Sequence, residues 1–315
     1  MESILTLSLT QNASDVHLAS NEKIIIRQNG QLSRLNAPPL THQQLEHKLF
    51  SILDAAQLLN LQQNKQLDFA LQINENCRFR GNIFYQNRGI SASFRHIRAN
   101  IATFEQINAP EIFKQLIQRQ QGLILISGAT GSGKSTTLTA MINQINQQQA
   151  KHIITLEDPI EFLYQNQLSL IQQRQVGLHC ASYREGLLAM LRQDPDIIVI
   201  GELRDRETVS AALQAAETGH IVFATLHTHS AVATLNRVID LFPDTSKQYI
   251  CSQLAHTMQA VISQKLVSDE KLGRKAKFEI LVNIPAVSNL IREGKIKQII
   301  SIMQTGKEYG MQNFD

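Results

Sequence analysis

Residues 128–135 read Gly-Ala-Thr-Gly-Ser-Gly-Lys-Ser, which is the Gly-x-x-x-x-Gly-Lys-Ser pattern of a phosphate-binding loop. Its glycines allow consecutive main-chain N–H groups to converge on a phosphate that a Cβ atom would exclude. We expect Lys134 to reach the β- and γ-phosphates of a nucleoside triphosphate, and the Ser135 hydroxyl to bind Mg²⁺. The alternative interpretation of this motif is a glycine-rich surface turn.

The flanking sequence argues against a simple turn. Residues 122–127 are apolar with β-type side chains, as in a buried parallel strand, and residues 136–142 carry apolar side chains at helical spacing. A helix that begins at about Lys134 adds the positive end of its dipole to the phosphate site. The residues that we predict to bind the nucleotide are Gly128, Ala129, Thr130, Gly131, Ser132, Gly133, Lys134, Ser135 and Thr136.

Composition is that of an ordinary soluble protein. The chain has 315 residues, of which 43% are hydrophobic and 18% charged, and its net charge of +3 is too small to argue for nucleic-acid binding. No apolar run approaches the length of a membrane span and no signal peptide is recognisable, so we expect a cytoplasmic protein. The three cysteines form no CxxC pair, which leaves a zinc cluster or a disulfide framework without support.

Two segments with different patterns of predicted secondary structure follow one another along the chain. Residues 1–98 read as an α+β domain with a hairpin at Asn29-Gly30 and one amphipathic helix from Thr41 to about Leu61. Residues 99–109 read as a linker. Residues 110–315 alternate strands, at 122–126, 152–156, 196–200 and 221–226, with helical patterns, one of which runs from about Arg206 to Glu217. This alternation predicts an α/β domain with a parallel sheet.

A second hairpin of the first domain, Cys77–Tyr85 with Ile90–Ile97, carries arginines on one face, Arg80 and Arg95 among them. Such a face is usually only the solvated side of a hairpin. In a multi-subunit ATPase the same arrangement could deliver arginine to a γ-phosphate.

Three strand ends of the second domain carry polar groups, and ligands of open α/β sheets bind at the carboxyl ends of strands. Glu157 begins an acidic stretch at a strand end. Negative side chains can lie beside phosphates if Mg²⁺ neutralises their charge. Glu202 stands where a water-polarising carboxylate belongs, although Gly201 replaces the usual strand-end Asp. His220 and His227 bracket the strand at 221–226, and His227 could contact the γ-phosphate.

Taken together, these motifs resemble those of the secretion-ATPase superfamily, and above all the PilT family of type IV pilus retraction ATPases. The resemblance covers nearly the whole chain. The matching segments are the Walker A loop at 128–135, an Asp box at 155–161, a Walker B region at 194–205, a His box at 218–227, an N-terminal signature at 13–18, the arginine hairpin at 78–98 and a retraction-type motif at 286–295.

The resemblance implies a RecA-like P-loop core with a smaller PAS-like N-terminal domain, assembled as a homohexamer with ATP and Mg²⁺ between the domains. It implies that Glu202 is catalytic, that Glu157 helps to place Mg²⁺ or water, and that Arg80, Arg95 and less surely Arg98 reach the phosphates. It further implies a motor that acts on an inner-membrane pilus platform protein at the cytoplasmic face of the membrane, without direct contact to lipid or nucleic acid.

Departures from the family pattern leave alternatives open. Ser288 stands where the retraction motif usually has Arg, His229 follows Thr228 where a small or amide residue is common, and relatives continue beyond Asp315. One alternative is a pilus-assembly or type II secretion ATPase, although those relatives usually carry a four-cysteine zinc motif that is missing here. Another is an accessory paralogue that binds nucleotide without motor activity of its own.

Overall fold

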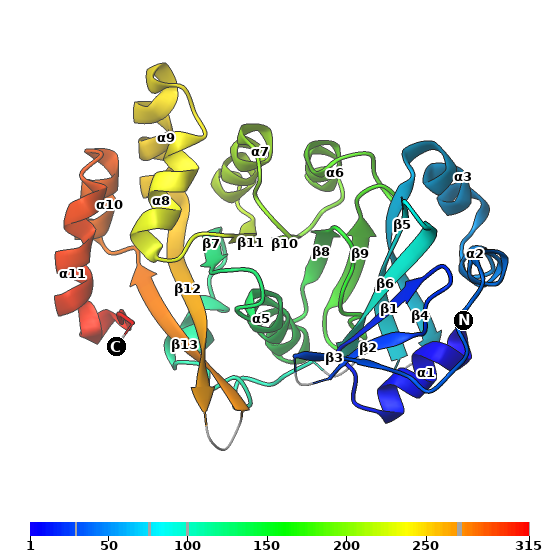
Figure 1. The fold of residues 1–315 in the computed structure, drawn as a ribbon. Coiled ribbons are helices and arrows are strands. Elements are labelled where there is room, and N and C mark those ends of the chain that lie inside the picture. The colour runs from blue at the N-terminus through cyan, green and yellow to red at the C-terminus, as the bar shows by residue number, and fades with distance from the viewer. Residues whose placement is uncertain (29, 75–76, 99–100, 270–272, 315) are drawn as a thin grey trace. The chain divides into compact units, whose positions relative to one another are not determined.

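The computed structural model of the chain describes residues 1–28, 30–74, 77–98, 101–269 and 273–314 (Figure 1). Two compact units divide it: Met1–Asn100 with Pro159–Leu163, and Ile101–Asp158 with Tyr164–Asp315. The predicted domain limits at 98 and 110 stay predictions. In the described residues, no helix is both long and apolar enough to cross a bilayer.

The first unit contains an antiparallel six-stranded sheet in the order β3-β2-β1-β6-β5-β4. Its elements are α1 (Glu2–Thr10), β1 (Asp15–Ala19), β2 (Ile25–Gln28), β3 (Gln31–Arg34), α2 (His42–Phe50), α3 (Ala55–Asn64), β4 (Gln66–Asn74), β5 (Cys77–Gln86) and β6 (Gly89–Arg98). Both predicted hairpins are confirmed as the antiparallel pairs β2–β3 and β5–β6. Asn29, which we assign to the first turn, lies outside the described residues.

The single helix expected from Thr41 to about Leu61 is wrong, because two helices occupy this stretch. Asp54 accepts a hydrogen bond from the main-chain N–H of Gln57, and the Gln57 side chain accepts one from the N–H of Asp54. This reciprocal capping box starts α3 as a new helix. The N-cap residue Asp54 has an extended backbone, so α2 must end before it. The helical spacing of apolar residues continues from Thr41 to Leu61, so the break between the two helices cannot be recognised from this spacing.

The second unit has a seven-stranded sheet in the order β13-β12-β7-β11-β10-β8-β9, parallel except for the edge strand β13. Its strands are β7 (Gly122–Ser127), β8 (His152–Glu157), β9 (Leu170–Gln175), β10 (Ile197–Ile200), β11 (Ile221–Leu226), β12 (Met258–Asp269) and β13 (Gly273–Val282). The strands predicted at 122–126, 152–156, 196–200 and 221–226 are confirmed. The predicted α/β class is confirmed with them.

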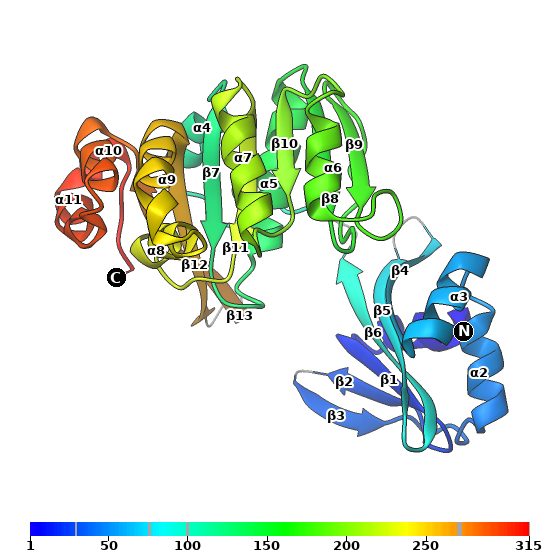
Figure 2. The ribbon, with the colours of Figure 1, turned by 90° about the horizontal axis from the view of Figure 1, so that it is seen from above.

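Helices cover both faces of this sheet. Helix α5 lies on one face, while α6 and α7 lie on the other (Figures 1 and 2). The helices of this unit are α4 (Ile112–Leu116), α5 (Lys134–Gln148), α6 (Tyr183–Met190), α7 (Arg206–Glu217), α8 (Ala231–Asp240), α9 (Asp244–Thr257), α10 (Pro285–Arg292) and α11 (Ile299–Thr305). The predicted span of α7 is confirmed, and its apolar face at Val209, Ala212, Leu213 and Ala216 is buried.

We predict that Asp54→Ala destabilises the first unit by about 1 kcal/mol, because the main-chain N–H groups at the start of α3 lose their acceptor. Asp54→Ser, which supplies another good cap, should retain most of the wild-type stability. Urea unfolding followed by circular dichroism measures both. Equal stability of Asp54→Ala and the wild type would contradict the helix break at residue 54.

Candidate functional site

The loop at residues 128–133 is shaped by glycines that no other residue could replace without rearrangement. Gly128 has φ 146° and Gly133 has φ 90°, both in the region that L side chains rarely adopt. A Cβ atom at Gly128 would collide with the main-chain oxygen of Gln264 and would lie 2.5 Å from Oγ of Ser132. The loop therefore follows the backbone of β12 closely before α5 begins at Lys134.

Gln264 on β12 holds this loop from within the protein, and the sequence analysis missed it. Its side chain is buried, its Nε2 donates to the Ser132 carbonyl over 2.8 Å, and its Oε1 accepts from Thr137 Oγ1 over 2.6 Å. Its residue type did not set it apart, because Gln259, Ser263 and Lys265 of the same strand are polar as well. Because Gln264 lies more than a hundred residues after the loop, its partners could not be read from the pattern.

Lys134 is buried at the centre of the site. Its ammonium group donates to the carbonyls of Gly128 over 2.7 Å and Ala129 over 3.0 Å, and its Nζ lies 3.2 Å from Nδ1 of His227. An ammonium group only donates, so Nδ1 of His227 accepts and the ring proton sits on Nε2. That Nε2 lies 3.1 Å from Oε1 of Glu202. The structure thus joins three of the predicted site residues in one chain of contacts.

Glu202 has a partner at each carboxylate oxygen. While Oε1 faces His227, Oε2 accepts a hydrogen bond from Nε of Arg204 over 2.7 Å. Nη1 of Arg204 lies 3.8 Å from Oδ2 of Asp158 at the end of β8. The hydrogen bond to Glu202 raises the pKa of Arg204 above its usual value.

Glu157 lies near this group of charges. Its Oε1 accepts from Thr155 Oγ1 over 2.6 Å and from Gln173 Nε2 over 3.1 Å. Burial, and then the carboxylates of Asp158, Glu202 and Glu157, raise the pKa of the Tyr183 phenol, while Arg204 opposes them. The phenol is therefore neutral among three acidic side chains.

Tyr183 also gives a physical reason for Gly201. A Cβ atom at position 201 would lie 3.0 Å from the phenolic oxygen and 3.2 Å from the carbonyl of Leu156. A strand-end Asp here would force Tyr183 or the end of β8 to move. The missing carboxylate thus fits the local packing.

The donor set is compatible with Mg²⁺ held jointly with phosphates. The described residues contain no group of three or more His, Cys, Asp or Glu side chains that could hold a metal ion by themselves. Mg²⁺ beside nucleotide phosphates typically uses only one or two protein ligands. The exposed Ser135 hydroxyl and the partly exposed Glu157 carboxylate are oxygen donors of that kind.

The other predicted residues whose side chains the structure describes have different partners. His220 is at the opposite end of β11, where Nδ1 lies 3.0 Å from the Ala215 carbonyl at the end of α7. Arg80 and Arg95 belong to the first unit, where they lie 3.7 Å from Glu161 and 2.8 Å from Asp15. The side chain of Arg98 falls outside the described part of the structure.

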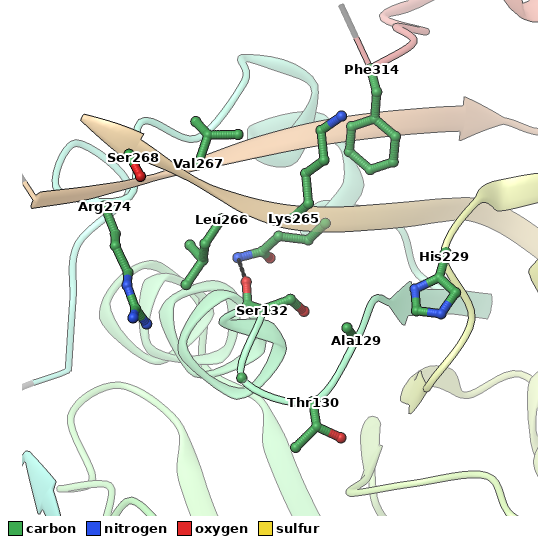
Figure 3. Close-up of a pocket in the computed structure, with 12 residues that line it drawn as sticks. Ala129, Thr130, Ser132, His229, Lys265, Leu266, Val267, Ser268, Arg274 and Phe314 are labelled. Atoms are coloured by element: carbon green, nitrogen blue, oxygen red, sulfur yellow. Dashed lines mark hydrogen bonds between the residues drawn. The ribbon is translucent and has the colours of Figure 1, made fainter. Parts of the chain in front are cut away.

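A pocket of about 570 Å³ adjoins the loop (Figure 3). Residues 129–132 form one wall and the β12–β13 ribbon forms another, with Leu266 and Arg274 among its side chains. His229 and Phe314 complete the lining, and Nζ of Lys265 lies 4.4 Å from the centre of the Phe314 ring. The pocket thus offers apolar, aromatic and cationic contacts beside a phosphate-binding loop.

Comparison with known proteins places the chain in a family. The chain matches the family described as type II/IV secretion system protein over residues 1–306. It is 49% identical over 314 residues to the uncharacterized protein YggR of Escherichia coli (strain K12), covering 100% of this chain and 95% of YggR. It is 44% identical over 312 residues to the type IV pilus retraction ATPase PilT of Pseudomonas aeruginosa, covering 99% of this chain and 91% of PilT.

A solved structure gives the same answer for the fold. The crystal structure of the pilus retraction motor PilT with bound ADP matches with a TM-score of 0.91 and 40% sequence identity, covering 96% of this chain and 89% of that chain. The predicted core and N-terminal domain are thereby confirmed at the level of fold. The chain therefore belongs to the type II/IV secretion ATPase family and, within it, to the PilT group that its motifs indicate.

Proposed function

We propose that this protein is a motor ATPase that works as a homohexameric ring, hydrolyses ATP and powers the retraction of type IV pili. The observation that carries the proposal is the chain of contacts from Lys134 through His227 to Glu202. It links the residue that would bind phosphate to the carboxylate that would activate water. The ADP in the PilT crystal structure supports a nucleotide as the ligand.

Phosphate binding would begin with Lys134. Two of its acceptors are main-chain carbonyls, which carry only partial charge. A β- or γ-phosphate offers full negative charge and is therefore the better partner for a buried ammonium group. The N–H groups of residues 131–136 and the N-terminus of α5 would add further donors.

Ser135 and Glu157 would hold Mg²⁺, which supplies charge neutralisation at the β- and γ-phosphates. Glu202 would orient the attacking water, and His227 would turn from Lys134 towards the γ-phosphate. The pocket beside the loop would take the nucleoside, with the base against Leu266 and Phe314.

The first unit would contribute Arg80 and Arg95 to the phosphates in the assembled ring. Arg80 and Arg95 are 43% and 70% exposed, so both guanidinium groups are accessible to a ligand. Arg80 pairs with Glu161 at the surface, where screening makes the carboxylate a weak competitor for a triphosphate. Arg95 would have to leave Asp15, a carboxylate only 12% exposed that it hydrogen-bonds over 2.8 Å. The names of PilT and of a gonococcal twitching motility protein, 46% identical over 292 residues, support a role in the type IV pilus machinery. Within that machinery, the proposed partner is a pilus platform protein at the inner face of the cytoplasmic membrane.

One observation favours an accessory role as the second candidate. Ser288, which replaces the usual Arg of the retraction motif, lies on α10 and donates from Oγ to the Ala255 carbonyl over 2.8 Å. The side chain of Ser288 therefore packs against the end of α9. A deletion strain scored for surface pili tests the two candidates: excess, non-retracting pili support retraction, unchanged piliation supports the accessory role, and bald cells contradict both.

We predict that the purified wild type releases phosphate from ATP and that Glu202→Gln lowers turnover roughly 100-fold or more, because the amide is too weak a base to orient water. Nucleotide binding should persist in this variant, since Glu202 contacts His227 and Arg204 and the phosphate-binding donors of residues 131–136 are unchanged. A phosphate-release assay with fluorescent-nucleotide titration measures both effects. Wild-type turnover in Glu202→Gln would remove this residue from catalysis.

We predict that Gln264→Glu weakens nucleotide binding about tenfold, because a carboxylate oxygen then faces the Ser132 carbonyl and the loop loses a buried hydrogen bond. Thr137→Val is the matched control: it removes the other partner of Gln264 and leaves the bond to Ser132. Calorimetric titration with ADP and a melting curve measure the two variants. An ADP affinity of Gln264→Glu equal to that of Thr137→Val and of the wild type would show that Gln264 serves stability alone.

A further inference from the structure

We propose that Arg204 is a positioning residue that fixes one oxygen of Glu202 so that the other is available to the attacking water. This inference rests on the proposed ATPase function. The guanidinium group spans two strand ends, since it donates to Glu202 just after β10 and lies 3.8 Å from Asp158 just after β8. No motif singled out this residue, which the sequence analysis passed over as part of the Walker B segment.

The backbone places Arg204 on the same side as Glu202. Between them, Leu203 is buried, and its N–H donates to the carbonyl of Thr225 over 2.9 Å. Anchoring of the intervening residue turns the two neighbours towards the carboxyl ends of the strands. The bond from Arg204 Nε to Glu202 Oε2, at 2.7 Å, has the short length of a charge-assisted hydrogen bond.

The two oxygens of Glu202 are not equivalent once nucleotide binds. Oε1 faces His227, which is itself in contact with Lys134. When phosphates attract Lys134 and His227, Oε1 loses its partner, whereas the bond from Arg204 to Oε2 does not depend on the loop. Glu202 would then keep one fixed oxygen and expose one free oxygen, which is the arrangement that a water-orienting carboxylate requires.

Surrounding charges make this cation necessary. Tyr183 and the carboxylates of Asp158 and Glu157 lie close enough to influence one another electrostatically. Removal of Arg204 would leave Glu202 among like charges, and these would push its side chain towards solvent. A planar, permanently charged guanidinium can bind carboxylates from two strands at once, which a single ammonium group does less well.

Stability should depend little on this contact. The Arg204 side chain is 56% exposed, and ion pairs at such positions contribute little to the free energy of unfolding. A positioning role therefore predicts a loss of turnover without a loss of melting temperature. A merely structural role predicts the reverse.

The test compares Arg204→Gln, Arg204→Lys and the control Arg206→Gln in the full chain with ATP as substrate. Arg206 is also about half exposed, and its partner is the adjacent Glu207. We expect Arg204→Gln to lower kcat about tenfold with KM nearly unchanged, the typical loss for one charge-assisted hydrogen bond. Arg204→Lys should restore part of kcat, and Arg206→Gln should match the wild type.

A double variant separates positioning from other effects. In the Glu202→Gln background, Arg204→Gln should cause no further fall in kcat, because it acts only through the Glu202 carboxylate. A wild-type kcat in Arg204→Gln, a change confined to KM, or an additive fall in the double variant each overturns the inference while the ATPase proposal stands. A wild type that does not hydrolyse ATP overturns both.

Discussion

The buried ammonium group of Lys134 is the constraint on which the rest of the site depends. Burial of a charge is costly unless hydrogen-bond acceptors surround it, and here the loop turns its own carbonyls at Gly128 and Ala129 inward to supply them. That inward turn requires the positive φ of Gly128 and a close approach to β12. Gln264 then becomes necessary, because a loop in this conformation leaves the Ser132 carbonyl buried in need of a donor.

Strand register explains why the other functional groups gather beside this lysine. β11 pairs in parallel with both β7 and β10, and β10 pairs with β8 so that Ile200 is opposite Leu156. Because these strands are mostly apolar and parallel, the charged and imidazole side chains at their carboxyl ends appear together at one edge. Glu157 ends β8, and His227 and Glu202 follow β11 and β10 by one and two residues, so the register fixes their distance from the loop more firmly than any pairwise contact does.

Sequence reasoning succeeded where information is local. The strands around the loop, α7 and both hairpins follow from periodicity, and the contacts of Lys134, His227 and Glu202 agree with strand-end placement. It failed from Thr41 to Leu61, where a capping box at Asp54 overrides continuous periodicity. It also missed Gln264 and Arg204, since the value of each depends on partners that only the folded chain supplies.

The same contacts would link the proposed nucleotide to the proposed catalytic carboxylate of Glu202. His227 contacts Lys134 through Nδ1 and Glu202 through Nε2. A ligand that draws Lys134 away therefore also changes the contact between His227 and Glu202. A carboxylate whose two oxygens both have partners until phosphates arrive is a poor partner for water before the nucleotide binds. Occupancy of the loop would therefore be a condition for water activation, a property that a motor needs if hydrolysis is to follow binding in order.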